Sequence, residues 1–199
     1  MNKKFIYGWW LPKEDRHFES YFSKSVQVGD KRLYQPQHID RCFHHIKNRK
    51  HTAIDVGGHC GFWSFYLAAN FKKVYAFEPV EIFRECFKKN IPHENVELEN
   101  TGATHVSNKT DDTNKVELKK LDDYELTDVD FIKIDVEGYE NQVVLGAKET
   151  LLRNKPIIIV EQKGFSDRFN ETQFEAIDTL KSYGAKVIDQ VVKDYILSW

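Results

Sequence analysis

Apolar and polar residues follow two alternating periods from residue 51 almost to the end of the chain. Short runs rich in β-branched and aromatic residues predict strands at 51–56, 73–78, 96–99, 129–135 and 156–161. Apolar residues recur with helical spacing in the segments between them, which predicts helices at 60–70, 80–90, 140–153 and 171–183. Strands that alternate with helices are typical of βαβ units, so the pattern predicts an α/β fold around a largely parallel sheet.

The end of the chain departs from this alternation. Residues 185–199 read as two strands joined by a turn near Lys193 and Asp194. Consecutive strands with a tight connection pair antiparallel, so the sheet is expected to be mostly parallel with an antiparallel C-terminal strand. The polar stretch 104–115 predicts a surface loop or a small hairpin.

The first 50 residues are of a different kind. Glycine and proline interrupt them, a helix is predicted at 37–47, and aromatic residues crowd the beginning at Phe5, Tyr7, Trp9, Trp10, Phe18, Tyr21 and Phe22. Two roles fit these aromatics: they pack over the sheet, or they form a lid or acceptor-binding element over a ligand site. We therefore divide the chain into an N-terminal extension, 1–50, and a ligand-binding domain, 51–199.

Composition narrows the range of partners and compartments that fit this protein. The balance of 29 Lys and Arg against 31 Asp and Glu gives a net charge of -2, which offers no strong field for nucleic acid or anionic lipid. No apolar run approaches the roughly 18 residues that a membrane span needs. Cys42, Cys60 and Cys86 lie in stretches predicted to be helical and show no CxxC spacing. They indicate reduced thiols in a cytoplasmic protein. From the charge balance and the lack of a long apolar run we expect neither a nucleic-acid nor a membrane partner.

A glycine-rich turn follows the first predicted strand, in the order Asp55-Val56-Gly57-Gly58-His59-Cys60-Gly61. Glycine lets the backbone approach a ligand that a Cβ would exclude. Dinucleotide-binding turns use G-x-G-x-x-G, which is absent here, while a carboxylate precedes the glycines. The turn therefore favours a cofactor with an amino-acid moiety, whose ammonium an acidic neighbourhood can neutralise.

A second acidic residue, Glu78, ends the second strand 23 positions after Asp55 and precedes Pro79. An acidic side chain at this place can accept hydrogen bonds from both hydroxyls of a ribose. Glu78 could instead cap the following helix. Taken with the turn, it predicts a nucleoside-containing cofactor.

Carboxylates also gather after the fourth strand, in Lys133-Ile-Asp135-Val-Glu137-Gly138-Tyr-Glu140. The carboxyl ends of such strands border the crevice in which α/β sheets bind ligands. Glu137 and Glu140 could merely serve as negative charges at a helix N-terminus. We predict that Asp135 accepts a proton or orients the acceptor, with Glu137 and Glu161 assisting. Such a cluster could also hold Mg²⁺, but with Lys133 nearby we predict no metal.

Four strings occur in an order that closely resembles the FkbM family of methyltransferases: 53–64, 74–79, 121–124 and 131–140. The resemblance implies a class I methyltransferase fold, a Rossmann-like three-layer sandwich with a seven-stranded sheet. It implies S-adenosyl-L-methionine as the donor and O-methylation of a hydroxyl on a sugar or small metabolite. By the same resemblance the methionine end is held by Asp55, Gly57, Gly58 and Gly61, the ribose by Glu78, and the adenine by Thr101, Gly102 and Ala103.

The chain departs from the family where Gly58 and His59 replace the usual small or Asn residues of the turn. His59 is expected to contact the cofactor or acceptor, or to fill the start of the helix. Three other functions are alternatives: an NAD-dependent oxidoreductase, a non-catalytic nucleoside-cofactor-binding module, and a nucleic-acid methyltransferase, for which an Asn-Pro-Pro-Tyr type of motif is missing. The expected partner is a small-molecule or glycan acceptor.

Overall fold

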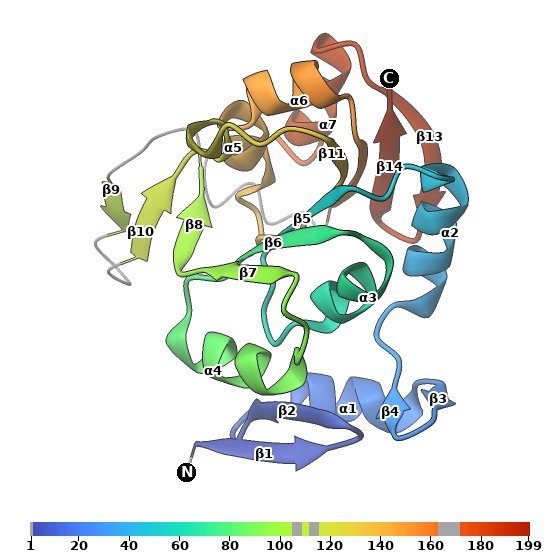
Figure 1. Ribbon diagram of the computed structural model, residues 1–199, viewed down its shortest axis with the longest axis vertical. Helices are drawn as coiled ribbons and strands as arrows, with labels where there is room; N and C mark the ends of the chain where they lie inside the picture. The colour runs from blue at the N-terminus through green and yellow to red at the C-terminus, as the bar shows by residue number, and fades with distance from the viewer. Residues whose placement is uncertain (1, 105–108, 112–115, 163–171) are drawn as a thin grey trace.

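A seven-stranded sheet forms the centre of the computed structural model, which describes residues 2–104, 109–111, 116–162 and 172–199 (Figure 1). The strands in spatial order are β13 (Lys186–Val191), β14 (Asp194–Ser198), β12 (Ile157–Glu161), β11 (Val129–Ile134), β5 (Thr52–Val56), β6 (Lys73–Phe77) and β7 (Val96–Glu99). All neighbours pair parallel except β14, which is antiparallel to both β12 and β13. The mostly parallel sheet with an antiparallel C-terminal strand is confirmed.

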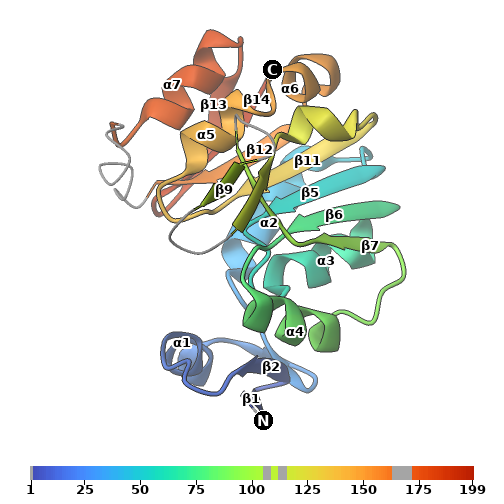
Figure 2. The same ribbon diagram turned by 90° about the vertical axis from the view of Figure 1, so that its left-hand side faces the viewer.

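Helices cover both faces of this sheet and make three layers (Figure 2). One face carries α2 (Pro36–Ile46), α3 (Phe62–Asn70) and α4 (Glu81–Asn90), and the other α5 (Glu140–Leu145), α6 (Lys148–Asn154) and α7 (Glu175–Ser182). Successive side chains of a strand point to opposite faces. Phe131 thus packs in the cluster that contains Trp63 of α3, whereas Ile132 packs in the cluster that contains Leu180 of α7.

The part of the N-terminal extension before α2 forms two short hairpins around one helix: β1 (Lys3–Ile6), β2 (Trp9–Pro12), α1 (His17–Lys24), β3 (Gln27–Val28) and β4 (Lys31–Arg32). It lies beneath α3 and α4 in Figure 1. Trp9 and Phe22 are fully buried, and the Trp9 ring lies 5.2 Å from the ring of Phe62 in α3. The extension and the sheet domain therefore share one hydrophobic core.

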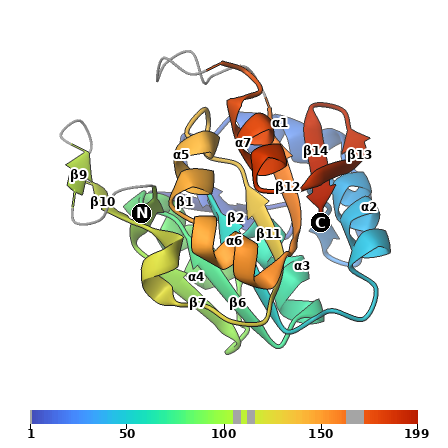
Figure 3. The same cartoon turned by 90° about the horizontal axis from the view of Figure 1, so that it is seen from above.

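A small second sheet follows β7. It contains β8 (Thr101–Ala103), β10 (Val116–Lys119) and β9 (Lys109–Asp111), and it is followed by a short 3₁₀ helix, η1 (Leu121–Tyr124). Figure 3 shows β9 and β10 projecting from one side of the body. The antiparallel pair β9–β10 confirms a small hairpin in the stretch 104–115, of which residues 105–108 and 112–115 lie outside the described residues.

The single helix predicted at 140–153 is wrong, because α5 ends at Leu145 and α6 begins at Lys148. The Asp122 carboxylate accepts hydrogen bonds from the backbone N–H groups of Glu149 (3.1 Å) and Thr150 (2.8 Å). A side-chain oxygen that accepts from the first turn of a helix stabilises its start. A residue of η1 thus begins a new helix after Gly146.

The first helix of the sheet domain begins at Phe62, two residues later than predicted, so Cys60 lies in the turn before it rather than in a helix. Cys42, Cys60 and Cys86 are buried free thiols. Among the described residues, no helix combines the length and apolarity that crossing a bilayer requires.

Candidate functional site

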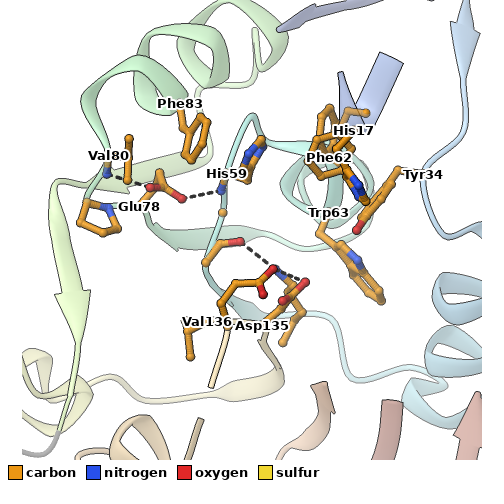
Figure 4. Close-up of a pocket in the computed structure, with 16 residues that line it drawn as sticks. His17, Tyr34, His59, Phe62, Trp63, Glu78, Val80, Phe83, Asp135 and Val136 are labelled. Atoms are coloured by element: carbon orange, nitrogen blue, oxygen red, sulfur yellow. Dashed lines mark hydrogen bonds and ion pairs between the residues drawn. The ribbon is translucent and has the colours of Figure 1, made fainter. Parts of the chain in front are cut away.

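A cavity of about 470 Å³ lies at the carboxyl ends of β5, β6 and β11 (Figure 4). Because the three strands are parallel, their carboxyl ends meet at one edge of the sheet. The volume is typical of small-molecule and cofactor sites. Its lining comes from both parts of the chain: His17, Phe18, Tyr34, Gly57, Gly58, His59, Phe62, Trp63, Glu78, Pro79, Val80, Phe83, Lys133, Asp135, Val136 and Glu137.

The structure brings about half of the predicted site residues together at this cavity, namely Gly57, Gly58, His59, Glu78, Pro79, Asp135 and Glu137. The others do not border it: Asp55, Gly61, Thr101, Gly102, Ala103 and Glu161. Glu161 instead borders a smaller adjoining cavity, together with Asp135. The aromatic lining and Lys133 were not among the predicted site residues.

Two glycines of the turn are required by close packing of the backbone. Gly57 has φ +81°, and a Cβ there would lie 1.9 Å from the carbonyl oxygen of Asp135. Gly61 has φ +88°, and a Cβ there would lie 2.8 Å from Cγ1 of Ile91. These glycines therefore let the turn lie against the end of β11 and against the residue that follows α4, in addition to any contact with a ligand.

Asp55 and Lys133 form a buried ion pair behind the turn. Lys133 Nζ lies 3.2 Å from Asp55 Oδ1 and 3.9 Å from Asp135 Oδ2, and it donates a hydrogen bond to the Gly57 carbonyl at 2.8 Å. The second oxygen of Asp55 accepts from Ser64 Oγ at 2.7 Å. Burial disfavours the Lys133 ammonium, but Asp55, Asp135 and Glu161 together hold its pKa above the ordinary value. A lone lysine inside the apolar strand Val129–Ile134 was the sequence signal for this role.

Backbone hydrogen bonds fix the orientation of the Glu78 carboxylate. Its carboxylate accepts hydrogen bonds from the N–H groups of His59 (2.8 Å) and Val80 (2.7 Å), one on each oxygen. Burial raises the pKa of Glu78, and the two N–H donors and Lys133 oppose that rise. Because an ionised carboxylate has about four acceptor positions, it can still accept hydrogen bonds from a ligand.

Three carboxylates converge beside Lys133. Oxygens of Asp135, Glu137 and Glu161 all lie within 4.8 Å of one another. The loop that carries the first two is fixed by Glu140, whose Oε1 accepts hydrogen bonds from the N–H groups of Gly138 (3.0 Å) and Val136 (3.3 Å). Such spacing suits the oxygen ligands of a divalent cation, whereas Lys133 already supplies a positive charge. That no metal binds here stays a prediction.

His59 links the turn to an aromatic wall. Its ring lies 3.8 Å from that of Phe83 in α4 and 4.7 Å from that of Phe18 in α1, measured between centroids. Burial, and then the charge of Lys133, lower the pKa of His59 to about 3, so the imidazole is neutral near pH 7. Its φ of +45° is unusual for a side-chain-bearing residue, and such conformations gather at functional sites.

The N-terminal extension supplies the opposite wall. Tyr34 is 9% exposed, and Figure 4 shows its hydroxyl directed inward on the side of Trp63. Burial and the charges of Asp135 and Glu161 raise the pKa of Tyr34, so the phenol keeps its proton. Beside it, Trp63 Nε1 donates to Gln35 Oε1 at 2.7 Å. Some aromatics of the extension thus pack in the core, as Trp9 does, and others border the cavity.

The strand order, the glycine turn after β5, the acid at the end of β6 and the carboxylates after β11 together define the class I methyltransferase fold with its ligand-binding edge. Residues 55–187 match the family model of the methyltransferase FkbM domain, and the chain therefore belongs to the FkbM methyltransferase family. The methyl donor of this family is S-adenosylmethionine. A comparison with curated protein sequences finds no match.

Solved structures show the same fold at low identity. Methyltransferase FkbM from Methylobacillus flagellatus KT is 16% identical with a TM-score of 0.55, over 75% of this chain and 43% of that one. The chain thus spans less than half of that protein. A precorrin-6y C5,15-methyltransferase from Geobacter metallireducens GS-15 is 13% identical (TM-score 0.55, covering 88% and 94%). An rRNA methylase from Streptococcus thermophilus is 16% identical (TM-score 0.51, covering 83% and 95%).

Proposed function

We propose that this methyltransferase transfers the methyl group of S-adenosylmethionine to a hydroxyl oxygen of a sugar or small metabolite. One observation carries the proposal: the turn at Gly57 and Gly58, the prealigned Glu78 and the carboxylate of Asp135 border a single cavity. A cofactor along the turn and Glu78 leaves the side of Tyr34 and Trp63 for the acceptor.

The charges at the cavity favour this cofactor over NAD. Three carboxylates border it, those of Glu78, Asp135 and Glu137. Among the lining residues that the structure describes, and leaving the histidines aside, Lys133 is the one side chain with a positive charge. S-adenosylmethionine brings a sulfonium and an ammonium against one carboxylate, whereas the pyrophosphate of NAD would add negative charge to carboxylates already close together. Like charges at short range in a partly buried site are costly.

The predicted contacts divide between direct and indirect roles. We assign the ribose to Glu78 and the methionine end to the backbone of the turn at Gly57 and Gly58, with Pro79 and His59 beside the cofactor. Asp55 acts through Lys133, which it holds against the Gly57 carbonyl. Gly61 holds the turn against α4. We place the adenine toward Thr101, Gly102 and Ala103, because Glu78 N–H donates to the Glu99 carbonyl at the end of β7 (3.1 Å).

Methyl transfer is an in-line displacement, in which the bond from carbon to sulfur breaks as the bond from carbon to the acceptor oxygen forms. The acceptor proton passes to Asp135 as general base, with Glu137 and Glu161 assisting. The protonated phenol of Tyr34 donates a hydrogen bond to the acceptor. The extension 1–50 thus acts as the acceptor-side wall of the catalytic domain 51–199.

The partner we propose is a small-molecule or glycan acceptor rather than nucleic acid. A net charge of -2 gives no extended attraction for a phosphate backbone. Three buried free thiols suit a reducing cytoplasm.

Thermal unfolding with S-adenosylhomocysteine or NAD tests the cofactor. A ligand at 100 times its Kd stabilises a protein by about 2.7 kcal/mol, which is about 5 to 11 °C for a chain of this size. We expect that rise with S-adenosylhomocysteine and none with NAD, and a much smaller rise for Glu78→Gln. A shift with NAD alone would overturn the proposal. Cofactor binding without transfer of a labelled methyl group to any hydroxyl in a panel would indicate the non-catalytic binding module.

A further inference from the structure

A second hollow of about 450 Å³ lies along α1, outside the cofactor cavity. It is lined by His17, Ser20, Tyr21, Lys24 and Ser25, and we call it the α1 groove. His17 borders both hollows, so the two are neighbours at this residue. A molecule long enough to pass His17 would contact both the acceptor side of the cavity and the α1 groove.

The lining follows one face of the helix. Positions 17, 20, 21 and 24 are three, four and seven residues apart, which places them on the same side of α1. At 1.5 Å per residue, Lys24 lies about 10 Å from His17 along the helix axis. That length exceeds a single sugar ring, so an acceptor that reaches Lys24 has at least two rings or one ring with a long substituent.

Charge changes sign between the two hollows. The cavity is bordered by carboxylates, whereas the far end of the α1 groove has Lys24, which is exposed and has no ion pair with any residue the structure describes. Arg32 adds a second cation there, because its Nη1 donates to the Ser25 carbonyl at 2.6 Å. The acidic residue of the helix, Glu19, is occupied by Lys4 Nζ at 2.6 Å.

We propose that the α1 groove binds the anionic group of an extended acceptor: a saccharide of at least two units, or a sugar joined to a nucleotide, that carries a carboxylate or phosphate. The reacting hydroxyl enters the cavity beside Asp135, and the anionic group lies against Lys24 with the hydroxyls of Ser20 and Ser25. The assignment of the reacting end rests on the proposed function.

Calorimetry on the protein saturated with S-adenosylhomocysteine tests the α1 groove with three probes: UDP-glucose, digalacturonic acid and the neutral disaccharide lactose. We expect at least one anionic probe to bind more tightly than lactose, and whichever does so names phosphate or carboxylate as the anion. Lys24→Glu should weaken that binding about fivefold or more, since it replaces an attraction by a repulsion, and leave lactose unchanged. Lys13→Glu, an exposed lysine outside the groove, makes the same change in net charge as a control.

The proposal is overturned if neither anionic probe binds more tightly than lactose, or if Lys24→Glu and Lys13→Glu behave alike. Failure of the cofactor assignment is seen separately, as absent binding of S-adenosylhomocysteine before any probe is added. In that event the same three probes on the unloaded protein still decide whether the α1 groove selects an anion.

Discussion

Lys133 shows how one side chain organises the site. Its ammonium lies between Asp55 and Asp135 and donates to the Gly57 carbonyl, so it connects β5, β11 and the glycine turn. It pairs with Asp55, a carboxylate that is fully buried, and so supplies the opposite charge that a buried acid needs. Asp135 is left partly exposed at the cavity and can meet an acceptor.

Asp135→Asn tests the proton acceptor. Asn keeps the shape but cannot take the proton, so turnover should fall about 10² to 10⁴-fold while the Kd for S-adenosylhomocysteine stays within a few fold. Initial rates of labelled methyl transfer to an accepted hydroxyl compound and calorimetry measure the two effects. Asp178→Asn on the exposed side of α7 is the matched control. Equal loss of cofactor binding would show that Asp135 is a cofactor ligand.

Gly57→Ala tests the close approach of the turn to β11. The new Cβ would meet the Asp135 carbonyl at 1.9 Å and the residue has a positive φ, so we expect a loss of at least about 3 kcal/mol in the free energy of unfolding. Gly29→Ala is the control, because Gly29 has φ +61° with no atom within 4 Å of the added Cβ. Backbone strain alone should cost it about 1 to 2 kcal/mol. Similar losses in urea unfolding would contradict the packing role of Gly57.

At the scale of elements, sequence patterns predicted all seven strands of the main sheet. The central strands β5, β11 and β12 are buried along their whole length and are therefore largely apolar, whereas the edge strands β7 and β13 are more exposed and were indicated by short β-rich runs. Periodicity could not predict contacts between segments that are far apart in the sequence. Asp122 begins α6 from a distant segment, and nothing local to residues 140–153 except Gly146 signalled the break. The hairpin β1–β2 turns at Tyr7 and Gly8, both with positive φ, without the Asn-Gly or Asp-Gly pair that usually indicates such a turn.

Part of the lining of the candidate site could also be predicted from the sequence. Glu78 and Asp135 were expected at the cavity because each is an acid at the end of a parallel strand, where such sheets bind ligands. Tyr34 and Phe18 could not be assigned to the cavity, since their position depends on how the extension packs against α3. Periodicity gives the buried face of a segment and not the neighbour that it contacts.

The Asn90 side chain connects α4, β2 and the glycine turn through hydrogen bonds. At the end of α4 its Oδ1 accepts from Trp10 N–H (2.7 Å), and its Nδ2 donates to the carbonyls of Trp10 (2.9 Å) and Cys60 (2.8 Å). Asn90→Ala removes the partner of the buried Cys60 carbonyl and of the two partly buried backbone groups of Trp10, so the free energy of unfolding should fall by about 2 to 4 kcal/mol. Asn48→Ala at an exposed position should change it by less than about 0.5 kcal/mol. Equal effects in urea unfolding would remove this bridging role.

At the scale of the whole molecule, the stability of the protein in acid depends on largely buried histidines and glutamates, whose pKa shifts have opposite effects. His38 and His59 have pKa values lowered by burial, so the unfolded chain takes up their protons first and stability falls as the pH drops below the ordinary histidine value near 6.5. Glu78 and Glu140 have pKa values raised by burial, so the folded chain takes up their protons first, which opposes the loss.

His59→Asn isolates one of these contributions. Asn tolerates the positive φ of this turn, and the loss of ring contacts with Phe83 lowers stability by an amount that does not depend on pH. Wild type should therefore be more stable than the variant at pH 7, and this advantage should shrink as the pH falls from 7 to 5, because wild type loses up to about 1.4 kcal/mol more per pH unit once the unfolded histidine is protonated. Urea unfolding at half-unit steps of pH measures both curves. Parallel curves would mean that the His59 imidazole accepts a proton in the folded protein, and that the aromatic wall joining the turn to the N-terminal extension is open to water.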